Sequence, residues 1–282
     1  MSQRVVLVVL DGLRPDAIVP DVMPGLHRLG RRFWRAERAT TIRPSVTVAA
    51  LTSLATGVAP DTHGLIAPGL GSLASMRAIR PLPRELERLG IRTTAVVGDL
   101  AGGSRLIART LLRMAGIREL VAAGPSARET VREAVRSFHR PGRHLTILYL
   151  NQVDQAGHQA GWKSKPYLDA AREIDLALQP LFALAEVEDT LLAITADHGG
   201  GGISPQDHDH PHPENDAIPL ILAGPGVRAR RVSRGPVGLL DIPPTILGTF
   251  GARVPGGYEG RVLTEAFAEA RPGRPASAEA VA

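Results

Sequence analysis

Short apolar runs recur along the chain and predict the strands of a sheet. None of them alternates strictly between apolar and polar positions, which is typical of strands in a sheet whose two faces are both covered. The predicted strands are Val5 to Leu10, Thr93 to Val97, Leu145 to Leu150, Leu191 to Thr195 and Ile218 to Ala223.

Helical periodicity occupies the segments between these runs. The predicted helices are Arg84 to Leu89, Ser104 to Met114, Ala127 to His139 and Pro166 to Ala185. Strands that alternate with helices favour an α/β fold with a doubly wound, mostly parallel sheet and helices on both faces. Sheets of this kind carry their functional groups at the carboxyl ends of the strands.

The chain is long enough to bury one substantial core. It has 282 residues, of which 44% are hydrophobic, and an α/β domain of this size need not divide. We therefore expect a single domain over residues 1–268. Residues 269–282 are rich in Ala, Pro, Gly and Glu and lack apolar periodicity, so we expect a flexible tail there.

The positive charge of the chain comes almost wholly from arginine. The formal net charge is +5, and Lys163 and Lys165 are the only lysines. The arginines are scattered along the sequence and aromatic residues make up only 4% of it, so we expect no nucleic-acid binding. The charge is still suited to attracting an anionic substrate.

Cysteine is absent, which excludes disulfides, thiolate metal sites and cysteine nucleophiles.

The N-terminal apolar run is too short to span a membrane, and Asp11 follows it at once. We therefore expect no signal peptide, no membrane association and a cytoplasmic location.

Acidic and histidine side chains follow three of the predicted strands. Asp11 ends the first run, Asp154 and His158 follow the third, and Asp197 and His198 follow the fourth. Asp11 and the Asp197-His198 pair could simply form turns, and Asp154 with His158 could be a surface pair. Carboxylate and imidazole are also the donors of divalent-metal sites, and the carboxyl ends of parallel strands share one edge. We therefore expect these side chains to meet there.

Two hydroxyl groups lie at the predicted start of a helix that ends at Thr56-Gly57. Ser45 and Thr47 would both lie in the positive field of that helix N-terminus, which favours an alkoxide and an incoming phosphate. Either could be a nucleophile, or either could be an ordinary N-cap.

A loop with alternating histidines adds further possible ligands, namely His208, His210 and His212. Taken alone it could be a surface loop or an adventitious metal binder. Together with the acidic residues it provides more oxygen and nitrogen donors than one tetrahedral ion requires. Two divalent ions are the simpler interpretation.

In this order the motifs resemble the alkaline phosphatase superfamily, and more closely its type I phosphodiesterase/nucleotide pyrophosphatase branch. The resemblance rests on these segments: Asp11-Gly12-Leu13-Arg14, Pro44 to Thr47, Thr56-Gly57, Thr62 to Leu65, Asp154 to His158, Asp197-His198-Gly199, Ile218-Pro219, Gly224-Pro225-Gly226 and Asp241 to Thr245. It implies two divalent ions, zinc first with manganese or magnesium as alternatives, on either side of a hydroxyl nucleophile.

The resemblance places the nucleophile on Thr47, with Ser45 less favoured. It implies that one ion is held by Asp11, Thr47, Asp197 and His198. It implies that the other is held by Asp154, His158 and a late histidine. His208 fits that last position best by its spacing, with His210 and His212 as rivals.

The implied reaction is hydrolysis of a small phosphorylated substrate: a phosphodiester, a pyrophosphate or a phosphomonoester. Thr47 would form a phosphothreonine that water then hydrolyses. The resemblance also leads us to expect an asparagine that binds a phosphoryl oxygen, and none follows Thr47 closely. Asn151 or the amide of Val48 is expected to supply that contact.

Two alternatives stay open. The chain could be a phosphotransferase or mutase of the same superfamily, or a non-catalytic descendant that binds a phosphorylated ligand. The sulfatase branch is disfavoured because its Cys/Ser-x-Pro-x-Arg motif is missing around Thr47.

Overall fold

The computed structural model describes residues 4–66, 79–98, 112–113, 115–187 and 189–268. The predicted tail over 269–282 lies outside the described residues. So does the helix predicted over 104–114, except for residues 112 and 113, which are helical.

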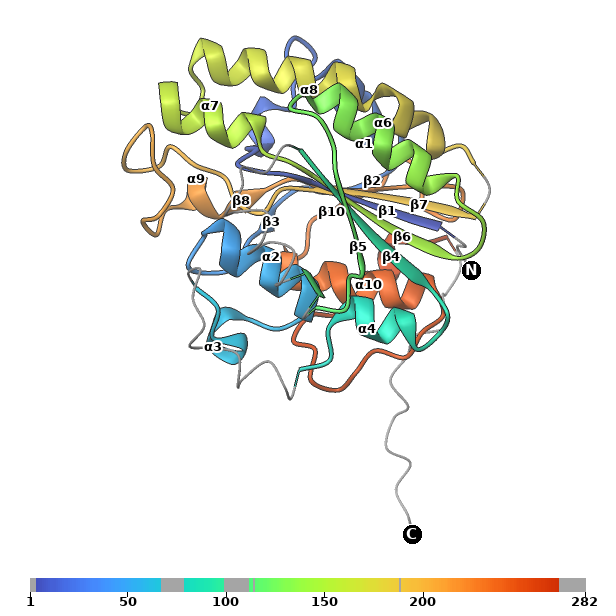
Figure 1. Ribbon diagram of the computed structural model, residues 1–282. Coiled ribbons are helices and arrows are strands. Elements are labelled where there is room, and N and C mark those ends of the chain that lie inside the picture. Colours follow the sequence, from blue (N-terminus) through green and yellow to red (C-terminus); the bar gives the residue numbers. More distant parts are fainter. Residues whose placement is uncertain (1–3, 67–78, 99–111, 114, 188, 269–282) are drawn as a thin grey trace.

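An eight-stranded sheet forms the centre of the molecule (Figure 1). Its order from edge to edge is β10, β2, β9, β7, β1, β6, β4, β5. The bounds are β1 Arg4–Leu10, β2 Trp34–Ala36, β4 Arg92–Val97, β5 Glu119–Ala122, β6 His144–Leu150, β7 Thr190–Thr195, β9 Leu220–Ala223 and β10 Val232–Ser233. All pairs are parallel except those of β9, which runs antiparallel to both β7 and β2.

Four of the five predicted strands are present within one residue of their expected start. The fifth, predicted over Ile218 to Ala223, is divided at Pro219, because proline has no amide hydrogen for the sheet. Its first part is β8 (Ala217–Ile218), which joins β3 (Ala39–Thr40) and β11 (Val237–Gly238) in a separate three-stranded sheet. Its second part is the antiparallel strand β9.

Helices cover both faces of the large sheet (Figure 1). On one face lie α1 (Pro24–Arg32), α6 (Ala127–Phe138), α7 (Gln152–Ala160) and α8 (Lys165–Leu184). On the other lie α2 (Thr47–Thr56), α3 (Pro60–His63), α4 (Leu82–Glu87) and α10 (Ile242–Thr249). The short helix α9 (Pro213–Asp216) precedes β8, and 3₁₀ turns occur at η1 (Pro15–Ala17), η3 (Leu239–Asp241) and η4 (Thr264–Ala266). The predicted α/β architecture is confirmed.

The core explains why the strand runs do not alternate. All six residues of β7 are buried, as are those of β1 after Arg4, because helices pack on both sides. Buried apolar residues form one cluster that extends from Val5 to Phe267. That residues 1–268 form a single domain remains a prediction. None of the helices in the described part of the chain is long and apolar enough to cross a bilayer.

Candidate functional site

Three neighbouring strands bring the predicted polar residues to one edge of the sheet. Strand β1 lies between β6 and β7, with Leu10 opposite Leu150 and Val9 opposite Thr195. The chain leaves all three strands at the same level, just before Asp11, Asn151 and Ala196. We call this side of the sheet the carboxyl edge; it lies at the left of Figure 1.

The first group at the carboxyl edge is Asp11, Asp197 and His198. Their donor atoms lie within 4.8 Å of one another, and all three residues are buried. Nε2 of His198 is 3.2 Å from Oδ1 of Asp11 and 3.7 Å from Oδ2 of Asp197. Asp197 and His198 converge although they are adjacent in the chain, because β7 has already ended at Thr195.

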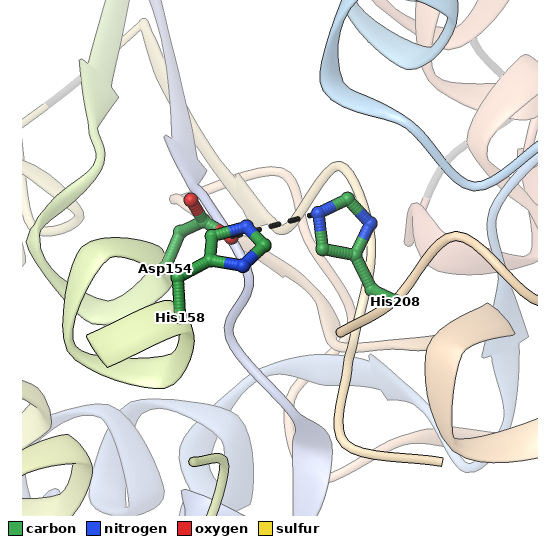
Figure 2. A group of neighbouring side chains, drawn as sticks. All are labelled: Asp154, His158 and His208. Atoms are coloured by element: carbon green, nitrogen blue, oxygen red, sulfur yellow. Dashed lines mark ion pairs between the residues drawn. The ribbon is translucent and has the colours of Figure 1, made fainter. Parts of the chain in front are cut away.

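The second group is Asp154, His158 and His208 (Figure 2). Asp154 and His158 lie one turn apart on α7, with 3.5 Å between His158 Nε2 and Asp154 Oδ1. His208 faces them from the loop before α9, with Nε2 4.0 Å from the same oxygen.

His210 and His212, the two alternatives to His208, lie outside this group. His210 is exposed, and Nδ1 of His212 accepts the amide hydrogen of Glu214. Of the three histidines in this loop, the structure thus brings only His208 to Asp154.

The two groups adjoin and form one site. The rings of His198 and His208 stack with their centroids 3.8 Å apart and an interplanar angle of 16°. The chain beside Asp11 also touches Asp154, because a Cβ atom on Gly12 would lie 2.9 Å from Asp154 Cα. Residues from four separate segments therefore surround a single position at the carboxyl edge.

Thr47 is the first residue of α2 and its hydroxyl faces this site. Thr47 Oγ1 is 3.2 Å from Nε2 of His198. The N-cap residue is Val46, and no side chain caps the helix, so Thr47 does not have the structural role of an N-cap. The hydroxyl of the buried Ser45 is instead 3.0 Å from the carbonyl oxygen of His208, to which it donates. The Ser45 hydroxyl is thus bound to the backbone of His208, whereas Thr47 is half-buried and its hydroxyl faces the site.

Each histidine of the site is oriented by a backbone carbonyl. Nδ1 of His198 lies 2.8 Å from the oxygen of Gly199, and Nδ1 of His208 lies 2.8 Å from the oxygen of Ser45. Nδ1 of His158 lies 3.0 Å from the oxygen of Gln206. A carbonyl can only accept, so it favours the proton on Nδ1 and leaves Nε2 as the free donor atom. Histidines that bind metals are oriented in this way.

Burial and neighbouring charges shift the pKa values of the titratable groups in the site. Burial, and then the charge of Asp197, raises the pKa of Asp11 well above its ordinary value. Burial also raises the pKa of Asp154. Burial opposes a charge on His198, but Asp197 and then Asp11 outweigh it and raise its pKa to about 10. Burial, and then His198, lowers the pKa of His208 to about 4. Three carboxylates gathered here favour added positive charge.

The site also holds carboxylate oxygens that no hydrogen bond satisfies. Oδ1 of Asp11, Oδ1 of Asp154 and Oδ2 of Asp197 are buried and have no hydrogen-bond partner in the part of the chain that the structure describes. Buried polar atoms are almost always paired, so these three require an explanation. Each faces the Nε2 atom of a site histidine, which is the arrangement that divalent cations need. The donor set therefore fits two such cations.

Tyr149 on β6 is a residue of the site that sequence reasoning missed. Its hydroxyl donates a hydrogen bond to Oδ2 of Asp11. This contact orients the carboxylate and leaves Oδ1 directed toward His198. The residue lies inside an apolar strand run, and nothing in the sequence separates its hydroxyl from that of a core tyrosine.

Trp162, in the turn after α7, was also missed. Its Nε1 atom donates to the carbonyl oxygen of Gly12 at 2.8 Å, and its ring meets those of His158 and His208 edge-on at 5.1 and 5.7 Å. Three glycines approach the indole so closely that a Cβ atom on any of them would lie within 2.7 Å of the Trp162 side chain: Gly157, Gly200 and Gly201. Trp162 thus contacts every strand-end segment that contributes to the two groups.

Asn151 lies between β6 and α7 and is half-buried. Its side chain makes no cap hydrogen bond to α7, and no hydrogen bond links it to the site among the described residues. The residue before Asn151 is Leu150, whose carbonyl oxygen accepts the amide hydrogen of Asp11 at 2.9 Å. Asn151 is therefore at the carboxyl edge, and its contact with a phosphoryl oxygen remains a prediction.

A protein-family model matches most of the chain. The family is "Type I phosphodiesterase / nucleotide pyrophosphatase", and the match covers residues 5–71 and 104–245. A curated relative, a 2,3-bisphosphoglycerate-independent phosphoglycerate mutase from Methanoculleus marisnigri, is 27% identical over 177 residues. That alignment covers 62% of this chain but only 38% of the mutase, so the chain spans well under half of that relative.

Solved structures share the fold at low sequence identity. A protein of the alkaline phosphatase superfamily from Vibrio parahaemolyticus matches with a TM-score of 0.70 at 18% identity, over 93% of this chain and 70% of its own. A phosphonate monoester hydrolase from Silicibacter pomeroyi matches with a TM-score of 0.67 at 16% identity, over 97% and 77%. A 2-O GAG sulfatase matches with a TM-score of 0.68 at 14% identity, over 98% and 76%. These three matches concern the fold alone.

Proposed function

Because the chain belongs to the type I phosphodiesterase/nucleotide pyrophosphatase family, we propose that it is a two-metal phosphoester hydrolase whose nucleophile is Thr47. The observation that carries the proposal is the position of the Thr47 hydroxyl. It lies at the start of α2 and 3.2 Å from Nε2 of His198, which is itself 3.2 Å from Asp11. A hydroxyl that faces the site, a helix N-terminus and a group of carboxylates with unsatisfied oxygens therefore coincide.

Asp11, Thr47, Asp197 and His198 would hold one divalent ion, and Asp154, His158 and His208 would hold the other. Bound there, the ions would stabilise negative charge on the attacking and leaving oxygens. Zinc suits a donor set of carboxylate oxygen and imidazole nitrogen, and manganese or magnesium are alternatives.

The chain's own groups perform two displacements at phosphorus. In the first, Thr47 Oγ1 attacks phosphorus and gives up its proton to solvent, the bond from phosphorus to the leaving oxygen breaks, the leaving oxygen takes a proton from solvent, and a phosphothreonine forms. In the second, water attacks the same phosphorus and gives up a proton, the bond from phosphorus to Oγ1 breaks, and Oγ1 is protonated again. The first amides of α2, among them that of Val48, have no carbonyl partner within the helix. They would hold a phosphoryl oxygen, and Asn151 is the proposed second contact.

A phosphotransferase or mutase is the second candidate function. The observation in its favour is the 27% identity to the phosphoglycerate mutase. Such an enzyme would pass the phosphoryl group from Thr47 to an alcohol rather than to water.

The cytoplasmic location expected from the sequence remains a prediction, which fractionation of the source cells would test.

A metal-supplemented screen tests the proposal. The full chain is assayed with p-nitrophenyl monoesters and with bis-p-nitrophenyl phosphate, in the presence of Zn²⁺, Mn²⁺ or Mg²⁺. Thr47→Ala should lower kcat by about 10³-fold or more, whereas Thr62→Ala, at an exposed threonine whose hydroxyl donates to Glu259, should leave it unchanged.

Trapping the intermediate gives a second readout. Acid quenching during turnover followed by mass spectrometry should find phosphate on Thr47. A Thr47→Ala protein that hydrolyses the substrate as fast as the wild type would remove Thr47 from the mechanism. Transfer of phosphate to added glycerol in preference to water would favour the phosphotransferase.

A further inference from the structure

Two arginine-rich segments that are remote in the sequence lie side by side at one end of the large sheet. They are residues 28–38, from α1 through β2, and residues 228–234, which contain the edge strand β10. The amide of Arg230 donates to the carbonyl of Arg32 at 2.9 Å, and the amide of Arg35 donates to the carbonyl of Arg231 at 2.9 Å. We call the surface formed by these two segments the basic edge.

The basic edge carries more positive charge than the whole chain. The two segments hold nine arginines and one glutamate, a formal charge of +8, whereas the chain as a whole carries +5. Arg32 pairs with Glu186, and Arg234 lies 3.9 Å from Glu37. Among the described residues, the other seven arginines of the basic edge form no ion pair. The guanidinium group of Arg228 donates to the carbonyl oxygen of Phe267 at 2.7 Å, and the guanidinium groups of the other six are available to an anionic partner.

The basic edge also contains a hollow. A cavity of about 260 Å³ opens between α1, β2 and β9. Arg31, Arg35, His27 and one acidic residue, Glu37, lie in its wall, together with apolar side chains such as Leu26 and Ile221.

We propose that the basic edge binds the phosphate backbone of a nucleic-acid strand without reading its sequence. Unpaired arginines recognise phosphates, and this contact carries no base information. Phe33 and Trp34, the aromatic residues of the two segments, are buried, so bases have no ring to stack on. None of the exposed large hydrophobic residues of the described chain belongs to these segments, which disfavours insertion into lipid.

This inference differs from the expectation drawn from the sequence, in which the arginines are scattered. The clustering arises only when β10 pairs with β2 and brings residues 228–234 beside residues 28–38. The inference does not depend on Thr47 or on bound metal.

Fluorescence anisotropy with a labelled oligonucleotide of mixed sequence tests the inference, with a chelator present so that no hydrolysis occurs. At about 50 mM salt the full chain should bind, and log K should fall linearly with log salt. The double variant Arg230→Glu/Arg231→Glu should weaken binding at least about tenfold and reduce the salt slope by about two.

The matched control is Arg128→Glu/Arg132→Glu on the exposed face of α6, which changes the net charge by the same amount. It should alter affinity less than about twofold, and Thr47→Ala should not alter it at all. Equal weakening by the two double variants, or no binding by the wild type, would overturn the inference. So would binding of the wild type to phosphatidylserine vesicles but not to the oligonucleotide, which would assign the surface to a membrane instead.

Discussion

Two kinds of buried carboxylate occur in this molecule, and they differ in how their oxygens are used. Asp175 on α8 is 1% exposed, and its oxygens accept the amide hydrogens of Gly25 and Leu26 at 2.9 and 2.7 Å. Asp11 and Asp197 are buried to a similar degree, but each leaves one oxygen without a hydrogen-bond partner among the described residues.

The difference separates stability from function. Asp175 satisfies two of the free amides at the start of α1, as an N-cap does, and its charge has a structural use. The carboxylates of the site are buried next to one another, so that burial, and then the charge of Asp197, raises the pKa of Asp11. Such an arrangement costs stability unless a cation is added. Mutations at the two places should therefore have opposite signatures.

The largest expected effect concerns Asp197→Asn. The change keeps an oxygen for the amides of Gly12 and His198 but removes the negative charge. We expect kcat/KM for a phosphoester substrate to fall about 10³-fold, or about 4 kcal/mol. Denaturant unfolding of the metal-free protein should show unchanged or higher stability. A stability loss as large as that of Asp175→Ala would contradict the comparison.

Asp175→Ala should show the reverse signature. It leaves the amides of Gly25 and Leu26 without an acceptor, and we expect the free energy of unfolding to fall by about 3 kcal/mol. Urea denaturation measures this loss, and kcat at a temperature where the variant is folded should match the wild type. Asp175→Asn, which keeps one acceptor oxygen, should lose less. Equal losses in both variants would show that the two hydrogen bonds are not the cause.

His144 is a buried titratable residue at the end of β6 opposite to the site. It is 1% exposed, and its Nδ1 atom has no hydrogen-bond partner among the described residues, yet it lies far along the strand from the site. Burial, and then the charges of Arg92 and Arg140, lowers its pKa to about 4 from an ordinary 6.5. This buried group belongs to the fold and should affect stability only.

The sign of its pH dependence follows from that shift. Between pH 6.5 and about 4 the unfolded chain binds a proton that the folded protein does not, so stability falls as the pH falls through this window. The loss should approach about 3 kcal/mol near pH 4. Comparing urea denaturation of the wild type and His144→Asn across this range measures it. A steep decline that persists unchanged in the variant would exclude His144 as the cause.

The smallest predicted effect concerns Trp162→Phe. The change removes the hydrogen bond to Gly12 and some packing against His158 and His208, but it leaves every proposed donor atom in place. We expect Zn²⁺ affinity, measured by competition with a chelator, to weaken about tenfold, or about 1.4 kcal/mol. Trp34→Phe is the matched control, because Trp34 is fully buried in the core and its Nε1 atom has no hydrogen-bond partner among the described residues. If both variants weaken Zn²⁺ binding equally, Trp162 has no special positioning role.

Much of the site could be predicted because its carboxylate and imidazole side chains follow strands. Asp11, Asp154 and Asp197 each come just after an apolar run, and parallel strands place their carboxyl ends together. The family resemblance then ordered these residues and singled out Thr47. The resemblance and the α/β fold are both confirmed, while the roles of the individual residues remain proposals.

Other features could not be predicted from local sequence. The spacing implied by the resemblance favoured His208 over His210 and His212, but the orientation of the His208 ring depends on a hydrogen bond to the carbonyl oxygen of Ser45, 163 residues away. The contact of Trp162 with Gly12 spans 150 residues. Such contacts depend on how distant segments cross, which residue periodicity does not record.

The sequence by itself determined the central strands β1, β4, β6 and β7, the helices α4, α6 and α8 and the kinds of donor that follow β1, β6 and β7, because burial on two faces imposes a continuous apolar run wherever a strand passes through the core. Only the tertiary structure decided the pairing of those donors into two groups, the carbonyls that orient the histidines, the antiparallel course of β9 and the gathering of arginines at the basic edge. The physical reason is that the apolar pattern is set residue by residue along the chain, whereas charge and hydrogen-bond geometry arise between segments that meet only after folding.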